Sequence, residues 1–231
     1  MCNTKIKVQE LGRMNYRQAW DYQERLVADI IARKRSNREA KRIVPTENYL
    51  LWVEHPPVYT LGKNGDINHL LLENASLKEK GIEFFHTNRG GDITFHGPGQ
   101  IVGYPILDLE NFFTDIHRYL RLLEEVVIKT LAEYGLKGAR SKGETGVWLD
   151  VETPFARKIC AMGVRASRWV TMHGFALNVN TDLRYFNNII PCGIQKDVTS
   201  MERELKEKRS LSLVKERLSY HFMELFEAEA M

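Results

Sequence analysis

Cys192 is a candidate nucleophile because of its position in the segment IIPCGI (residues 189–194). The preceding proline fixes a turn, and the following glycine leaves room for a substrate to approach the thiol. A free thiol with a pKa of about 8.5 is only a few per cent thiolate at neutral pH, so catalysis requires a neighbouring cation. The residues alone leave an alternative open, since a cysteine in apolar surroundings is often an inert packing residue.

Lys158 is the candidate for that cation. It opens the segment KICAMGV (158–164), whose other residues are apolar or small. A lysine in an apolar strand is costly unless it has a partner or a function, and the alternative is an edge-strand lysine whose stem snorkels to solvent. Cys160 follows on the same face and is either a rival nucleophile or a packing thiol. His96 or His173 could complete a Cys-His dyad, but the flanking residues typical of papain-like proteases are absent.

A glycine-rich run, RGGDITFHGPGQ (89–100), is the third feature that could do chemistry. Glycines at this density indicate a backbone that turns tightly or approaches a ligand closely. One interpretation is a hairpin with its turn at 97–99. Arg89, His96 and Gln100 around exposed backbone N–H groups also suit an acyl or phosphate group, although the P-loop and dinucleotide-binding patterns are absent.

These residues must be positioned by a sheet with packed helices. Apolar, β-branched and aromatic runs between turn signals predict strands at 5–11, 48–54, 57–61, 82–87, 93–96, 101–109, 146–151, 158–165 and 170–179. Apolar residues at helical spacing predict helices at 15–32, 115–134 and 211–227, the first with Asn15 as its cap. The six cations between Arg33 and Arg42 are interpreted as a solvated loop, with a docking patch for an acidic partner as the alternative.

The expected fold class is therefore α/β of the α+β type, a single domain over residues 1–231 with a mixed, mostly antiparallel sheet. Repeats and low-complexity linkers are absent, and the lack of regular βαβ alternation disfavours a Rossmann fold. The length, with 43% hydrophobic and 27% charged residues, suits a folded globular protein.

Charge and cysteine content exclude several functional classes. The 33 Lys and Arg exceed the 30 Asp and Glu by only three, too few for a dedicated nucleic-acid binder. Neither a membrane-spanning segment nor a signal peptide is expected. Three cysteines without Cys-x-x-Cys spacing indicate neither a disulfide framework nor a structural zinc site, so a reducing cytoplasm is the expected location.

Five segments together span roughly the middle two-thirds of the chain: HPPVYTLGK (55–63), RGGDITFHGPGQIVGYPILDL (89–109), KICAMGVR (158–165), HGFALNVNTDL (173–183) and PCGI (191–194). In this order they resemble the lipoyl(octanoyl) transferase family. The resemblance implies an enzyme that transfers an octanoyl group from acyl carrier protein to a protein lysine. The family fold is similar to that of biotin protein ligases and lipoate ligases.

The resemblance implies the roles of particular residues. Cys192 matches the family's acyl-accepting cysteine, and Lys158 matches the lysine that acts beside it. Cys160 departs from the family, which more often has alanine at this position. The substrate-contacting residues implied by the resemblance are Arg89, Gly90, Gly91, Asp92, Ile93, Thr94, Phe95 and His96, then Ala161, Met162 and Gly163, and finally Gly174, Phe175 and Ala176.

The implied partners are octanoyl-acyl carrier protein as donor and, as acceptor, lipoyl domains of 2-oxoacid dehydrogenase complexes or the glycine cleavage H protein. Exchange between thioesters is nearly balanced in energy, so no ATP is expected. No other cofactor, no metal, no nucleic acid and no membrane is expected as a partner either. Two alternatives stay open. One is an ATP-dependent lipoate or biotin ligase, and the other is a non-catalytic module that binds acyl groups or docks a carrier protein.

Overall fold

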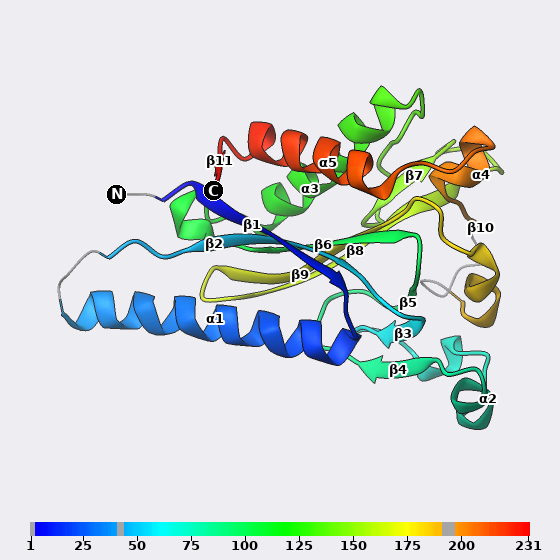
Figure 1. Ribbon diagram of the computed structural model, residues 1–231, viewed down its shortest axis with the longest axis horizontal. Coiled ribbons are helices and arrows are strands. Elements are labelled where there is room, and N and C mark those ends of the chain that lie inside the picture. Colours follow the sequence, from blue (N-terminus) through cyan, green and yellow to red (C-terminus); the bar gives the residue numbers. More distant parts are fainter. Residues whose placement is uncertain (1–2, 41–43, 191–196) are drawn as a thin grey trace.

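The computed structural model describes residues 3–40, 44–190 and 197–231 (Figure 1). Within these ranges eight strands form one sheet in the order β10-β8-β9-β6-β2-β1-β11, with β7 also paired to β8. The strands are β1 (Lys5–Arg13), β2 (Asn48–Glu54), β6 (Gln100–Ile106), β7 (Val147–Leu149), β8 (Arg157–Ser167), β9 (Val170–Asn178), β10 (Asp197–Val198) and β11 (Glu229–Ala230). The strands expected at β1, β2, β6, β7, β8 and β9 are confirmed, with ends that shift by a few residues, whereas the short strands β10 and β11 were not expected.

The direction of the strands makes this sheet mixed. Its centre, β2-β6-β9-β8, is antiparallel, whereas β1 is parallel to both β2 and β11, and β10 is parallel to β8. The parallel pair β1 and β2 is connected by helix α1 (Tyr16–Glu39), which is one βαβ unit. This unit does not continue into a regular βαβ alternation, because β2 is antiparallel to its other neighbour β6, in keeping with the expectation, and the mixed α/β class is confirmed.

A smaller sheet has the order β4-β3-β5 and contains β3 (Val58–Leu61), β4 (Glu83–His86) and β5 (Ile93–His96). The tripeptide 97–99 makes a turn, since the Gln100 N–H donates to the Gly97 carbonyl at 3.2 Å. It does not make the expected hairpin, because β5 pairs with β3 in the small sheet and β6 pairs with β2 and β9 in the large one. The glycine-rich run thus carries the chain from one sheet to the other.

Helices cover both faces of the large sheet. Figure 1 shows α3 (Ile116–Glu133) and α5 (Leu211–Leu225) together on one face and α1 on the other, with α1 beginning beside the small sheet. Buried apolar residues of α3 and α5, such as Leu123 and Phe222, belong to one core, and Leu26 and Ile30 of α1 belong to a second. The remaining short helices are α2 (Asn74–Glu79), α4 (Met201–Leu205), η1 (Ile67–His69), η2 (Leu109–Asn111) and η3 (Leu183–Asn188).

Two local expectations about α1 were wrong. Asn15 precedes the helix, but its side chain makes no capping hydrogen bond. The helix also does not end near residue 32; it continues to Glu39 through most of the basic segment, whose residues 41–43 lie outside the described ranges. The cause is long-range, because a cation of this segment has a buried partner elsewhere in the chain.

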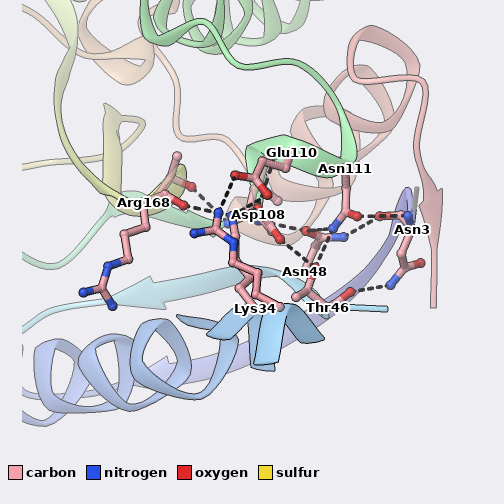
Figure 2. Close-up of polar contacts among 11 residues, drawn as sticks. Asn3, Lys34, Thr46, Asn48, Asp108, Glu110, Asn111 and Arg168 are labelled. Atoms are coloured by element: carbon pink, nitrogen blue, oxygen red, sulfur yellow. Dashed lines mark hydrogen bonds and ion pairs between the residues drawn. The ribbon is translucent and has the colours of Figure 1, made fainter. Parts of the chain in front are cut away.

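That cation is Lys34, whose Nζ donates to Asp108 Oδ1 at 2.5 Å and to the Arg168 carbonyl at 2.8 Å (Figure 2). Asp108 is buried as well, and its second oxygen accepts a hydrogen bond from Thr46 at 2.8 Å. The backbone N–H of Asp108 donates to the Asn48 side chain. This buried ion pair joins α1 to the end of β6, the start of β2 and the β8-β9 turn, so Lys34 is not part of a solvated loop.

Among the helices of the described ranges, none is long and apolar enough to cross a membrane.

Candidate active site

A cavity of about 560 Å³ lies between strands β8 and β9 and the glycine-rich loop, which is the part of the glycine-rich run before β5 (residues 89–92). Every residue that the resemblance implied as substrate-contacting lines this cavity, except Phe95. Phe95 instead stacks on Tyr185 at a centroid distance of 4.5 Å and packs against Phe186, on the other side of β5. A volume of this size is typical of small-molecule sites, which span about 300–1,000 Å³.

Arg89 holds the glycine-rich loop in shape. Its Nη2 donates to the carbonyls of Thr60 and Asp92 at 2.6 and 2.9 Å, and its Nη1 donates to the Gly90 carbonyl at 3.0 Å. The side chain is buried, and a third bond from Nη2 reaches the Thr60 hydroxyl. Most of the guanidinium donors therefore organise protein backbone, so Arg89 shapes the cavity wall.

Close approach of backbones explains the glycines here. The Gly90 N–H donates to the Val164 carbonyl at 3.0 Å, which seats the loop against the edge of β8. A Cβ on Gly163 would lie 2.6 Å from the Gly90 carbonyl oxygen, and a Cβ on Gly62 would lie 2.1 Å from that of Gly91. Side chains at these two positions would push the loop away from both sheets.

Lys158 is the second residue of β8 and lines the same cavity. It is 9% exposed, and both β7 and β10 pair with the strand at this residue, so it is not an edge-strand lysine that snorkels. Its Nζ lies 4.5 Å from the centroid of the Trp148 ring, and its carbonyl accepts from the Thr199 N–H at 2.9 Å.

The three cysteines differ in what the structure describes. Cys192 and Cys2 lie outside the described residues. Cys160 is fully buried in the core that α3 and α5 cover, and it does not line the cavity. Burial raises the pKa of the Cys160 thiol, so it stays protonated at neutral pH. Of the two interpretations of Cys160, the structure supports the packing thiol.

Both candidate histidines are buried in the cavity wall. Nδ1 of His96 lies 2.8 Å from Gln100 Oε1, and Nε2 of His173 lies 2.7 Å from Asn88 Oδ1. Burial lowers the pKa of His173 to about 3, and burial with the neighbouring His55 lowers that of His96. These rings are neutral at pH 7, and each is oriented by an amide side chain.

Sequence reasoning missed part of the cavity wall. Tyr16 at the start of α1 and Tyr104 on β6 are both buried there, and burial raises the pKa of Tyr16 to about 12. Apolar lining residues come from elements far apart in the sequence: Ile116, Leu120, Met162, Val164, Phe175 and Phe186. The loop before β7 adds Gly143, Glu144 and Thr145. No local sequence signal brings these residues together.

Within residues 3–40, 44–190 and 197–231, no group of three or more His, Cys, Asp or Glu side chains is placed so that it could hold a metal ion.

Residues 15–223 match the family model described as "Lipoyl protein ligase A/B catalytic domain". The chain is 66% identical over 229 residues to the octanoyltransferase of Flavobacterium johnsoniae, covering 98% of this chain and 99% of that protein. It is 65% identical to the octanoyltransferase of Christiangramia forsetii over 229 residues, covering 98% of each. The chain therefore belongs to the octanoyltransferase family and is an acyltransferase.

Solved structures agree on the fold. A bi-partite lipoate protein ligase from Thermoplasma acidophilum superposes with a TM-score of 0.69 at 16% identity, covering 99% of this chain and 88% of that one. A lipoate-protein ligase A bound with ATP gives a TM-score of 0.69 at 15% identity, covering 99% and 87%. At this identity the similarity concerns the fold, and the expected likeness to lipoate ligases is confirmed.

Proposed function

We propose that this chain transfers an octanoyl group from acyl carrier protein to a lysine of lipoyl domains, through a thioester on Cys192. The observation that carries the proposal is one cavity whose wall contains Lys158 together with all three implied substrate-contacting segments. The octanoyltransferases named above supply the reaction class, since they match nearly the full chain. Lipoyl domains or the glycine cleavage H protein are the proposed acceptors.

In the first half-reaction, the Cys192 thiolate attacks the carbonyl carbon of the donor thioester. The Lys158 ammonium favours that thiolate by charge. When the tetrahedral intermediate collapses, the bond from the acyl carbon to the carrier sulfur breaks, and Lys158 gives its proton to the departing carrier thiolate. The products are octanoyl-Cys192, a carrier thiol and a neutral Lys158 amine.

In the second half-reaction, the acceptor lysine arrives as a neutral amine and attacks the octanoyl-Cys192 carbonyl. The Lys158 amine takes the proton that the attacking nitrogen must lose. The bond to the Cys192 sulfur breaks, which leaves an amide on the acceptor and restores both the thiolate and the ammonium. One lysine thus serves both half-reactions, and no nucleotide is consumed.

Backbone N–H groups around Gly91, or that of Cys192 itself, are the proposed donors to the oxyanion of each intermediate. Support for Gly91 is that the loop is pinned on both sides, by the Arg89 guanidinium and by the Gly90–Val164 hydrogen bond. A rigid loop keeps its dipoles oriented, which is the property that an oxyanion site requires.

The apolar part of the wall is the proposed slot for the octanoyl chain. Ile116, Leu120 and Met162 belong to it. Burial of the chain supplies about 0.8 kcal/mol of affinity per methylene, so the depth of the slot sets the preferred chain length. We further propose that residues 1–231 act as one catalytic domain, and that it works in the cytoplasm, where a catalytic thiol stays reduced.

A transfer assay tests this proposal. Octanoyl-acyl carrier protein and a lipoyl domain are incubated with the enzyme in the absence of ATP, and the acceptor is analysed by mass spectrometry. The expected result is one octanoyl group on one acceptor lysine, lost with Cys192→Ala. Transfer that requires ATP and survives Cys192→Ala would favour a ligase, and a complete lack of transfer would favour a binding module.

A further inference from the structure

Trp148 lies directly beside Lys158. The two residues are register partners of the antiparallel pair β7-β8, and the ammonium nitrogen sits 4.5 Å from the centroid of the indole ring. Trp148 is 2% exposed, so the pair is shielded from bulk water. A cation over an indole face is attracted by the ring quadrupole, and the attraction grows when the pair is desolvated.

The backbone of Trp148 is paired on both sides, which fixes the position from which the indole ring projects. Besides the β8 partner, Trp148 exchanges two hydrogen bonds with Ala139: the Ala139 N–H donates to the Trp148 carbonyl at 2.8 Å, and the Trp148 N–H donates to the Ala139 carbonyl at 2.9 Å. The register of β7 against β8 shifts between Val147 and Trp148. This irregularity sets which residue of β7 faces Lys158.

Gly146 leaves space for the lysine stem. A Cβ at this position would lie 3.7 Å from Lys158 Cε and only 2.6 Å from the Cys160 carbonyl oxygen. The residue also has a φ of +122°, which side chains rarely adopt. The Lys158 side chain therefore lies next to both Gly146 and Trp148.

We propose that Trp148 is a positioning residue that holds the Lys158 ammonium in place through its ring face. This inference rests on the proposed function of Lys158. The attraction acts only on the charged form, so it orders the side chain for the first half-reaction, in which the ammonium is needed. Once the proton has moved to the carrier thiolate, the neutral amine loses this attraction to the ring.

The test uses fluorinated tryptophans placed at position 148, because fluorine removes the negative potential of the ring face with little change in shape. The rate of acyl-enzyme formation is measured in single turnover with octanoyl-acyl carrier protein. We expect a graded fall with one, two and four fluorines, by about 2- to 30-fold in total, the range that cation–π energies allow. Trp148→Phe should retain more of the rate than Trp148→Leu.

The control places the same residues at Trp52, which is buried in the core and donates to Ser219 but does not line the cavity. Its fluorination should leave the rate unchanged. A wild-type rate with tetrafluorotryptophan at 148 would overturn the inference, as would a graded fall that persists in a Lys158→Met background, where the cation is gone.

The same experiment separates this inference from the proposed function. If Lys158→Met slows acylation while fluorination at 148 does not, the result supports the catalytic role of Lys158 and contradicts its positioning by Trp148. If Lys158→Met leaves the rate unchanged, the result contradicts the proposed role of Lys158, and with it the inference about Trp148.

Discussion

At the scale of single residues, the account depends on a lysine that uses both of its protonation states. Lys158 lies in the cavity wall with its charge beside an aromatic ring. Its position in an apolar strand was the sequence signal, since a lysine is rarely buried without a purpose. The sequence did not reveal Trp148 as its neighbour, because that pairing depends on the register of β7 against β8.

Replacing Lys158 with arginine should separate the two half-reactions. Arginine keeps the positive charge but does not lose its proton at accessible pH. We expect the acyl-enzyme still to form, though more slowly, because the carrier can leave as a thiolate without a proton from residue 158. It should then accumulate, with transfer to the acceptor slowed about 100-fold or more, the usual contribution of a general base. Time-resolved intact mass measures both steps, and Lys158→Met should impair both. Transfer at the wild-type rate with arginine would contradict the general-base role.

Cys160 should behave as a packing residue. Burial raises the pKa of its thiol, so in the folded protein it should resist alkylation by iodoacetamide at pH 7 to 9. The measurement uses a variant with Cys2 and Cys192 both changed to serine, followed by mass spectrometry with and without denaturant. Modification only after unfolding is expected, whereas rapid modification of the native protein would show an accessible thiol.

At the scale of elements, local patterns predicted α3, α5 and most strands. The helix from Ile116 has a strong apolar face, and Asp115 caps it by accepting from the Arg118 N–H at 2.9 Å. The end of α1 was not predictable in this way. Lys34 pairs with Asp108, 74 residues further along the chain, and a local excess of charge does not reveal such a partner.

The Lys34–Asp108 pair should be sensitive to the loss of one partner. Lys34→Met leaves a buried carboxylate without its counter-ion, so we expect a loss of about 3–5 kcal/mol in the free energy of unfolding. The double variant Lys34→Met/Asp108→Leu should recover part of that loss, since neither charge is then buried. Urea unfolding of the two variants measures this. A loss below about 1 kcal/mol for the single variant, as for an exposed pair, would contradict the account.

Gly62 should be intolerant of a side chain, because its Cβ would overlap the Gly91 carbonyl oxygen. Gly62→Ala must displace the glycine-rich loop, so transfer should fall at least about tenfold, as misplaced catalytic groups usually cause. Gly81→Ala is the matched control. Gly81 has a positive φ of +63° but open space around it, so a stability loss of about 1–2 kcal/mol is expected there, with activity retained. Equal activity of the two variants would argue against a packed loop.

At the scale of the whole molecule, the cavity joins elements that sequence analysis could only treat separately. The family segments predicted three parts of its wall, and the structure adds α1, α3 and the loop before β7 through Tyr16, Ile116 and Thr145. Figure 1 shows α1 and α3 on opposite faces of the large sheet, and residues of both helices line this one cavity. Such meetings follow from topology, and no short motif encodes them.

The buried histidines predict how stability depends on pH. Burial lowers the pKa of His55 to about 4 and of His173 to about 3 in the folded protein, against about 6.5 unfolded. Below pH 6.5 the unfolded chain therefore binds more protons, and stability falls as the pH falls toward the folded values. Each histidine should cost about 2 kcal/mol at pH 5 relative to pH 7.

Urea unfolding at pH 7 and pH 5 measures this dependence. Glu133, whose pKa is lowered to about 2 by Arg217, enters only below about pH 4.5, where its unfolded carboxyl titrates. His173→Gln should therefore flatten the profile between pH 7 and 5. An unchanged slope in this variant would mean that His173 is not the titrating group.

The proposed mechanism requires a covalent octanoyl intermediate on Cys192, which intact mass spectrometry detects after incubation with octanoyl-acyl carrier protein. A single octanoyl adduct is expected on the wild-type chain, absent in Cys192→Ser and retained in Cys160→Ala. An adduct that persists in Cys192→Ser, or no adduct on the wild-type chain under conditions that support transfer, would contradict this mechanism.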